Sequence, residues 1–599
     1  MRSGLRSRRV ARTLRAGAVT GVLALALAGC VSLPVAGPVV EVERQSAGEA
    51  DTGGAAAIDA RQPQDGQSPP EVVKGFLDAM QAWPTELATA KEFLSSEART
   101  TWNPQGTIVY EDALPPAGGA GRVELRVGGA DRLDARGAWL GALSSEEDSL
   151  AFRLVLEEGE YRIADLPPAL VVPTTWFEQR YRQVALYFPD TTGTVLVPEP
   201  VFVGDDSTFA STLVSGLLRG PGPRLRVVVS SQLPSGLRVD LSVPVTDGTA
   251  AISLTGDASA FTPADTELLV SQLAWTLRQD PDIDAFTLDI DGRAVRTAQG
   301  ATRFSVQAGD RLDPVGFQSD SLLYGLRDGL LVAGTPGSLE PVDGVLGRVP
   351  LGLRSVSVDL ASDQVAAVSD GGTTAYLAPL SDGGAGATDG GEDPGLADVA
   401  TVATGTDFLP PAWDVHDRLW LVDRTPLGAV VQWHGEERSG VVEVPGVSGQ
   451  QVSELLVSRD GSRLVVVVRG PRGDSLRVAR IRTDAEGGVA GVTRARAVAI
   501  EDGASRRIRD VAWNSTTTLA VLNRLTDVSA KVVTVGVDGS PGGLDGITTT
   551  LSGATALAGS PVPGARVYAV TDSGLADLNA TVRGPRVLDE GVSYLDYAG

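Results

Sequence analysis

The sequence contains few of the side chains that most often carry out chemistry. Among its 599 residues there is one cysteine, Cys30, and there are two histidines, His416 and His434. A lone cysteine cannot form an internal disulfide bond, so the hydrophobic core must stabilise the fold by itself, which a chain of this length allows. None of the three lysines follows a glycine, which excludes a phosphate-binding Gly-Lys loop.

The two histidines are badly placed for catalysis or for binding a metal ion. Ser-His-Asp and Cys-His sites need a histidine beside the nucleophile, and zinc sites need clustered Cys or His ligands. His416 lies in the turn Val415-His416-Asp417-Arg418 and His434 in a short strand, and we interpret both as surface or turn residues. Asp289-Ile290-Asp291-Gly292 has two acids of a calcium loop but no third ligand, so a tight turn is predicted there. No catalytic, cofactor-binding or metal-ligating residue is expected.

Carboxylates are the one abundant reactive group. The chain has 75 Asp and Glu residues, and a glycosidase needs only two carboxylates about 5–9.5 Å apart, a separation that a sequence does not measure. We interpret these acids as a solvated surface, and a carboxylate-dependent cell-wall hydrolase stays the alternative.

The first 29 residues have the parts of an export signal. Six arginines and no acid precede an apolar run, Ala16 to Gly29, of about fourteen residues, which is shorter than a membrane-spanning helix needs. Leu27-Ala28-Gly29-Cys30 resembles the lipobox of bacterial lipoproteins. The resemblance implies cleavage before Cys30 and attachment of an S-diacylglycerol and an N-acyl chain such as palmitate to this residue. A small buried cysteine in a plain signal peptide is the alternative, and Arg8-Arg9 leaves twin-arginine export open.

The mature chain is strongly acidic. Loss of residues 1–29 removes six positive charges and takes the formal net charge from −24 to −30 over 570 residues. A mature chain with this negative charge repels nucleic acid and anionic lipid, so we expect neither to be a direct ligand. Two acyl chains anchor a protein lastingly, so we expect it at the extracytoplasmic face of the cell membrane, held by the lipid on Cys30.

Composition and periodicity predict a flexible tether followed by two α+β domains. The tether, residues 30–67, has few large apolar side chains. In the first domain, 68–180, a helix is capped at Ser68, a second helix spans Thr89 to Arg99, and strands span 121–127, 150–156 and 161–164. The second domain, 181–300, has the order β, β, α, β, β, α, β. Its expected elements span 184–188, 193–197, 209–217, 237–243, 249–254, 262–277 and 285–290.

From residue 310 to 599 short strands alternate with Gly, Asp and Ser turns, and units repeat. Ala412-Trp413-Asp414 with Leu419 matches Ala512-Trp513-Asn514 with Leu519. The aligned strand starts are Leu330, Val365, Leu419, Leu464, Leu519 and Val567. Their spacing is that of propeller blades, typically about 40–50 residues. We predict an all-β propeller of about six blades, with an exposed loop at Asp382 to Gly395 and the repeated tryptophans packing inside blades; two stacked β-sandwiches, and a binding role for the tryptophans, are the alternatives.

The second domain resembles the GerMN domain of sporulation and germination proteins. The resemblance lies in blocks that occur in order: Val184-Ala185-Leu186-Tyr187-Phe188, Leu217-Leu218-Arg219-Gly220-Pro221, Leu233-Pro234-Ser235-Gly236, Thr246-Asp247-Gly248, Gln272-Leu273-Ala274-Trp275-Thr276-Leu277 and Asp289-Ile290-Asp291-Gly292. With the lipobox, a first domain ending in Tyr161-Arg162-Ile163-Ala164-Asp165-Leu166-Pro167 and the propeller, the whole chain resembles the LpqB lipoproteins of actinobacteria.

The resemblance implies a non-enzymatic accessory of an MtrA/MtrB-type two-component system. The expected partner is the extracytoplasmic domain of the sensor histidine kinase, whose signalling in cell division and envelope homeostasis the protein would modulate. Only Cys30, as the lipidated residue, takes a defined role from this resemblance. A scaffold that binds the cell wall without a kinase partner is a further alternative.

We expect Cys30→Ala to prevent lipid attachment, because the thiol is the acceptor of the diacylglyceryl group. Labelled palmitate should not enter the variant, and the protein should move from the membrane to the soluble or precursor fraction. Ser32→Ala, two residues beyond the attachment site, is the control and should label as the wild type does. Palmitate labelling of Cys30→Ala would contradict the assignment.

Overall fold

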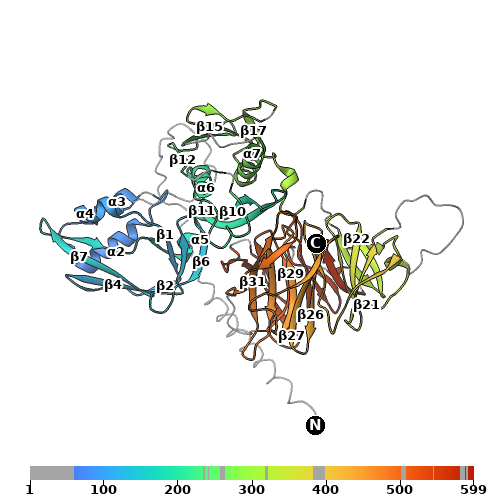
Figure 1. The fold of residues 1–599 in the computed structure, drawn as a ribbon. Helices are drawn as coiled ribbons and strands as arrows, with labels where there is room; N and C mark the ends of the chain where they lie inside the picture. The colour runs from blue at the N-terminus through green and yellow to red at the C-terminus, as the bar shows by residue number, and fades with distance from the viewer. Residues whose placement is uncertain are drawn as a thin grey trace, which may run out of the picture. The chain divides into compact units, whose positions relative to one another are not determined.

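The computed structural model describes residues 60–599 apart from 86, 232, 234–235, 241, 257–262, 298, 317–321, 382–397, 501–506, 544–545, 581–586 and 589–590. Cys30, the leader and most of the predicted tether therefore lie outside the described residues, as does the predicted loop at 382–395. Figure 1 colours the first domain blue to cyan, the second green, and the C-terminal domain yellow to red. No helix of the described residues is both long and apolar enough to cross a membrane.

The first domain packs helices on two small sheets. Its elements are α2 (Pro69–Ala79), α3 (Leu87–Glu92), α4 (Ser96–Thr101), β1 (Gly106–Tyr110), β2 (Asp112–Ala113), β3 (Ala117–Gly119), β4 (Arg122–Gly128), β5 (Asp131–Asp134), β6 (Trp139–Ala142), β7 (Ser149–Glu157), β8 (Glu160–Asp165), β9 (Leu170–Pro173) and α5 (Thr174–Glu178). The sheet orders are β6-β5-β1-β9 and β2-β4-β7-β8. The predicted helix start at Ser68 is confirmed, since its N–H donates to the Glu71 carboxylate at 2.8 Å.

The predicted helix from Thr89 to Arg99 is wrong, because the chain breaks it into α3 and α4. Between them the main chain pairs with β8: the Ser95 N–H donates to the Ile163 carbonyl at 2.8 Å, and the Ile163 N–H to that of Phe93 at 2.9 Å. Ser95 then caps α4 through its hydroxyl. Tertiary hydrogen bonds thus interrupt a sequence that has helical propensity.

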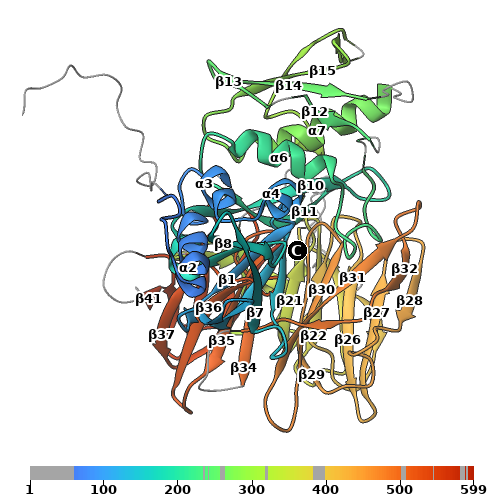
Figure 2. The same cartoon turned by 90° about the vertical axis from the view of Figure 1, so that its left-hand side faces the viewer.

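The second domain is built from a long hairpin, two helices and a mixed sheet. Its elements are β10 (Tyr181–Pro189), β11 (Leu196–Gly204), α6 (Phe209–Leu218), β12 (Arg238–Val239), β13 (Val245–Thr246), β14 (Thr249–Thr255), α7 (Pro263–Leu277), β15 (Ala285–Ile290), β16 (Arg293–Ala294), β17 (Arg303–Ser305) and the 3₁₀ turn η1 (Asp310–Leu312). Strands β14 and β15 pair in parallel, joined through α7. Figures 1 and 2 both show α6 and α7 on one side of this sheet.

Two predicted strands of this domain have different bounds. The second strand, expected at 193–197, starts at Leu196 and continues through Pro198 and Pro200 to Gly204. A two-stranded sheet tolerates these prolines because one edge of each strand needs no N–H donor. Of the strand expected at 237–243, Arg238–Val239 pair with β14, and the Asp240 N–H donates to the Ser253 carbonyl of β14 at 3.0 Å.

The C-terminal domain is a propeller of six sheets in the described residues, which confirms the predicted fold class. Its strands are β18 (Leu323–Arg327), β19 (Leu330–Thr335), β20 (Ser338–Pro341), β21 (Leu353–Val358), β22 (Gln364–Ser369), β23 (Thr374–Pro379), β24 (Ala400–Thr404), β25 (Ala412–Trp413), β26 (Leu419–Thr425), β27 (Gly428–His434), β28 (Ser439–Val442), β29 (Val452–Val457), β30 (Arg463–Val468), β31 (Ser475–Thr483), β32 (Val489–Val492), β33 (Arg496–Ala497), β34 (Ile508–Trp513), β35 (Thr518–Arg524), β36 (Ser529–Gly536), β37 (Thr548–Ser552), β38 (Ala554–Ala558), β39 (Tyr568–Thr571), β40 (Gly574–Asp577), β41 (Val587–Leu588) and β42 (Val592–Tyr597), with helix α8 (Val345–Arg348). We number the blades 1 to 6 and call the strands of each blade a to d from the channel outward.

Blade 1 closes the ring, because its innermost strand comes from the other end of the domain. Its order is β20-β19-β18-β42, so β42 is strand a and pairs with β18 over Leu323–Arg327. Five of the aligned strand starts fall at or next to b strands, whereas Leu330 begins the c strand β19. The spacing from Leu330 to Val365 is therefore shorter than the spacings between the other aligned strand starts.

The repeated tryptophans were predicted to pack inside blades. In the structure each of them also contacts the neighbouring blade. Trp413 Nε1 donates to the Ser357 carbonyl of blade 2 at 3.3 Å, and Trp513 Nε1 to the Val457 carbonyl of blade 4 at 3.1 Å. Both indoles are buried. The repeat therefore encodes a contact from one a strand to the preceding one.

We expect Leu595→Ala on β42 to destabilise the propeller by about 2–5 kcal/mol, since it leaves a cavity at the closing strand. Leu595 is buried among side chains of blades 1 and 6. The propeller transition in calorimetry of the full chain should move to lower temperature. Leu427→Ala removes the same atoms from a side chain that is 90% exposed and should leave the transition unchanged. If Leu595→Ala and Leu427→Ala lowered the transition temperature equally, the result would contradict the role of β42 in closing the propeller.

Candidate functional site: the b–c face and channel of the propeller

The two ends of the propeller differ in which strands they connect. At one end, which we call the b–c face, strand b turns into strand c and strand d leads to the next strand a. At the other, the a–b face, strand a turns into b and c into d. The distinction decides which loops are available for binding.

Hairpin β10–β11 of the second domain occupies the a–b face. Thr191 Oγ1 donates to the Thr483 carbonyl at 2.9 Å, and Gln183 Nε2 donates to Ser540 Oγ at 3.1 Å. The fully buried Arg463, at the start of β30, donates to the Pro198 carbonyl and pairs with Asp460. The second domain therefore covers the part of this face that blades 4 and 5 form.

His416 lies on this a–b face in the turn that the sequence predicted, but it is not a surface residue. Its side chain is 9% exposed, and Nε2 lies 3.6 Å from Oδ2 of Asp190 in the β10–β11 turn. Burial, and then the nearby Arg418 guanidinium, lower the pKa of His416. His434 ends β27 as predicted, and burial lowers its pKa as well.

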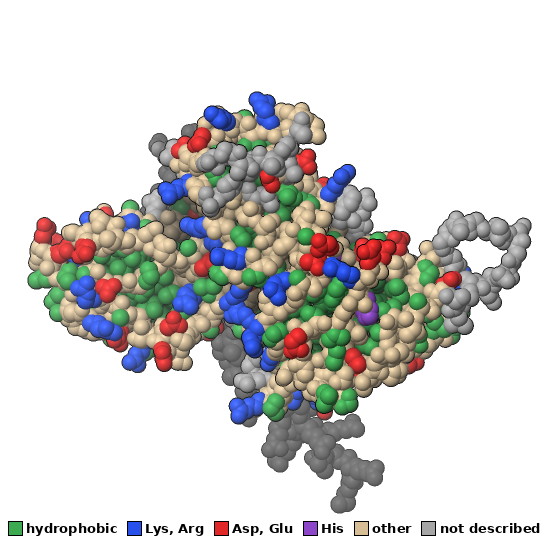
Figure 3. Space-filling model, viewed as in Figure 1, with side chains coloured by type: hydrophobic (Ala, Val, Ile, Leu, Met, Phe, Trp, Pro, Cys, Tyr) green, Lys and Arg blue, Asp and Glu red, His purple; other side chains and the backbone are tan. Residues whose placement is uncertain are grey.

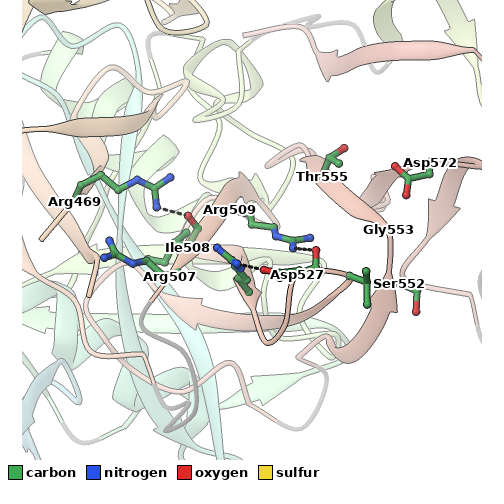
Figure 4. Close-up of a pocket in the computed structure, with 11 residues that line it drawn as sticks. Arg469, Arg507, Ile508, Arg509, Asp527, Ser552, Gly553, Thr555 and Asp572 are labelled. Carbon is green, nitrogen blue, oxygen red and sulfur yellow. Dashed lines mark hydrogen bonds and ion pairs between the residues drawn. The ribbon is translucent and has the colours of Figure 1, made fainter. Parts of the chain in front are cut away.

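On the b–c face a cavity of about 890 Å³ lies between blades 4, 5 and 6 (Figure 4). Its wall is unusually basic for a chain with 75 acids and 51 Lys and Arg residues. The lining residues are Arg469, Arg507, Ile508, Arg509, Arg524, Asp527, Val528, Ser552, Gly553, Thr555 and Asp572. We call this cavity the arginine pocket. Figure 3 shows acidic and basic side chains on the same face of the molecule. A negative net charge of the whole chain therefore does not exclude a local group of basic side chains.

Two arginines of the pocket share one carboxylate. Arg469 and Arg507 both pair with Asp474, whose side chain is fully buried, and Arg507 Nη1 lies 2.9 Å from its Oδ1. Arg469 Nη1 also donates to the Ile508 carbonyl at 2.7 Å. One negative charge thus holds two guanidinium groups, which are 35% and 45% exposed.

The other two arginines have weaker compensation. Arg509 donates to the carbonyls of Ala554 and Asp527, both at 2.7 Å, and so meets neutral oxygens. Arg524 pairs with the Asp527 carboxylate, which is 86% exposed and therefore well screened by water. Figure 4 shows Arg469 and Arg507 at one side of the pocket and Ser552, Gly553, Thr555 and Asp572 at the other.

Two apolar side chains project from b–c loops on the same face. Leu427, between β26 and β27, is 90% exposed, and Val528, between β35 and β36, is 71% exposed. Large apolar side chains exposed near a pocket are typical of a surface that another molecule covers.

The propeller channel holds half-buried titratable groups. Glu454, Asp510, Tyr594 and Asp596, from three a strands, line a cavity of about 220 Å³. Burial raises the pKa of all four groups, that of Asp596 to about 7. Asp510 Oδ2 accepts the Leu557 N–H at 2.6 Å.

Glu454 and Asp510 interact directly, since each carboxyl group affects the pKa of the other. The two carboxyl groups of a glycosidase pair are held apart, at about 5–5.5 Å in retaining enzymes and further in inverting ones. Among the described residues no group of three His, Cys, Asp or Glu is arranged to hold a metal ion. Asp291 and Gly292 form the predicted tight turn, with φ of 49° and 72°.

Sequence reasoning missed both the arginine pocket and the channel acids. The available signal was the pair Arg509-Asp510, which interrupts the apolar strand Ile508–Trp513 next to a repeated tryptophan. Charged residues in an inner strand indicate a polar channel or rim, whereas Asp474 and Asp572 stand in ordinary turn contexts that give no such indication.

The domains match known family models in order. The model described as "Lipoprotein LpqB, N-terminal domain" matches residues 62–178, "Sporulation and spore germination" matches 185–296, and "Lipoprotein LpqB beta-propeller domain" matches 329–583. The chain belongs to the LpqB lipoprotein family.

Proteins named lipoprotein LpqB in several actinobacteria align along most of the chain. The protein of Rhodococcus opacus is 29% identical over 90% of this chain and 89% of its own, and that of Thermobifida fusca is 27% identical over 79% and 82%. Among solved structures, the first GerMN domain of GerM from Bacillus subtilis matches at 22% identity and a TM-score of 0.18, over 21% of this chain and 97% of that one. The expectation that this LpqB family member is non-enzymatic stays a prediction.

Asp596→Asn should stabilise the propeller at alkaline pH. The pKa of Asp596 is about 7 in the fold and about 3.9 when unfolded. The folded state therefore binds more protons between these values, so the favourable contribution is complete below the unfolded pKa and is lost as pH rises through about 7. A shift of about three pKa units corresponds to about 4 kcal/mol. We therefore expect the propeller Tm of the variant to exceed that of the wild type by about 8 °C or more at pH 8, and the difference to be much smaller at pH 4.5.

The control for this experiment is Glu437→Gln, which neutralises an exposed acid of the same propeller. It should give the same small difference from the wild type at both pH values. A pH-independent effect of Asp596→Asn would contradict the raised pKa of this carboxyl group.

Proposed function

We propose that this LpqB lipoprotein is held at the extracytoplasmic face of the cell membrane by lipid on Cys30 and binds the extracytoplasmic domain of an MtrB-type sensor histidine kinase. In this role it modulates signalling through an MtrA/MtrB-type system and so affects cell division and envelope homeostasis. The observation that carries the proposal is the contrast between the two propeller faces. One face is partly covered by the β10–β11 hairpin, and the other exposes Leu427, Val528 and the arginine pocket.

Binding at the b–c face gives a route to control without chemistry. A ligand shifts a two-state protein only by its difference in affinity for the two states. A sensor domain that presents its binding surface in one signalling state alone is therefore held in that state by the propeller. The lipid anchor contributes by confining both proteins to one membrane surface, which raises their effective concentration.

The decisive measurement compares purified proteins. The kinase's extracytoplasmic domain is immobilised, and binding of the mature chain is measured by interferometry. We expect the double variant Leu427→Asp, Val528→Asp to bind at least tenfold more weakly, since it places charges on the two exposed apolar tips. Val441→Asp is the matched control, because Val441 is 70% exposed but lies on the outermost strand β28 of blade 3.

Wild-type affinity in the double variant would exclude the b–c face, and an equal loss in Val441→Asp would show a nonspecific effect. In cells, gene deletion and Cys30→Ala should both change phosphorylation of the response regulator. Unchanged phosphorylation in both strains would contradict a role in signalling, and crosslinking to wall polymer alone would favour the scaffold.

A further inference from the structure

We propose that the arginine pocket receives acidic side chains from an extended segment of the partner protein. The inference rests on the proposed function in that the segment belongs to the protein bound at the b–c face. It adds the chemistry of recognition: two carboxylates with an apolar side chain beside them.

Charge is the first argument. Four guanidinium groups face three carboxylates, those of Asp474, Asp527 and Asp572, so one positive charge remains in a body whose net charge is strongly negative. Asp474 is buried beneath two of the arginines and acts to hold them in place. Arg509 donates to main-chain carbonyls, which orient the guanidinium group but do not neutralise its charge.

Geometry is the second argument. A guanidinium presents planar, paired N–H donors that match a carboxylate. Asp474 and the Ile508 carbonyl fix Arg469 and Arg507 side by side, and the remaining donors of these partly exposed groups are available to a ligand. The cavity of about 890 Å³ is within the range of ligand pockets, about 300–1,000 Å³, and admits side chains of a segment but no folded domain.

The wall beyond the arginines favours a peptide over a simple anion. Val528 is 71% exposed and lines the pocket, so it offers an apolar contact next to the charges. Ser552, Thr555 and Asp572, at the other side, offer acceptors for the N–H groups of a main chain. A free phosphate would contact neither the apolar Val528 nor these hydrogen-bond acceptors.

The test uses the mature full chain and a fluorescein-labelled peptide, Gly-Glu-Leu-Glu-Gly, with Gly-Gln-Leu-Gln-Gly as its uncharged counterpart. Anisotropy should show binding of the acidic peptide that is at least tenfold tighter than that of the amide peptide and that weakens with salt. The double variant Arg469→Gln, Arg507→Gln should lose at least tenfold in affinity. Arg472→Gln, an exposed arginine of the β30–β31 loop outside the pocket wall, should bind as the wild type does.

Several results would overturn the inference. These are equal binding of the two peptides, no binding of the acidic one, and wild-type affinity in a double variant whose circular dichroism and Tm show that it is folded. Competition by inorganic phosphate or polygalacturonate in the absence of any peptide binding would assign the pocket to another class of anion and would also overturn it. Because the peptide assay contains no kinase, its failure leaves the interferometry result for the Leu427 and Val528 variants standing, and the reverse holds too.

Discussion

Closure of the propeller ring is the constraint on which the rest of the structure depends. Strand β42, at the C-terminal end, pairs with β18, more than 260 residues earlier, and so completes blade 1. The chain has no disulfide to fix this contact and relies on apolar burial at the junction, where Leu595 and its neighbours from blades 1 and 6 are covered. An open ring would separate the a strands and with them the channel acids and the pocket wall, because both are assembled across blades.

The closed ring then has two unlike faces. The second domain contacts the a–b face at blades 3 to 5, and buried charge is part of that contact. Arg463 is fully buried, and it pairs with Asp460 and donates to the Pro198 carbonyl. Both terminal nitrogens of this guanidinium are paired, whereas its Nε has no hydrogen-bond partner among the described residues. The contact therefore depends on the Asp460 carboxylate and the Pro198 carbonyl, because a buried charge is costly unless it is paired. The opposite face keeps apolar loop tips and a basic pocket, a combination that suits a protein partner and differs from the acidic character of the chain as a whole.

Much of the architecture could be predicted from local patterns. The cap at Ser68 and the periodic patterns at 209–217 and 249–254 each depend on a few neighbouring residues, and the structure has the expected helix or strand at each. Predictions were wrong where distant strands intervened. The helix at Thr89 to Arg99 is broken by pairing with β8, and the repeated tryptophans reach across to the preceding blade.

The sequence by itself indicated a lipobox-like motif, the order of three domains and a propeller of about six blades, because each depends on short, local or periodic signals. The tertiary structure alone decided the functional surface. Arg469, Arg509 and Asp572 come from three blades, and no spacing along the chain shows that they line one cavity. Their proximity follows from the curvature of the closed ring, which sets neighbouring blades side by side whatever the length of chain between them.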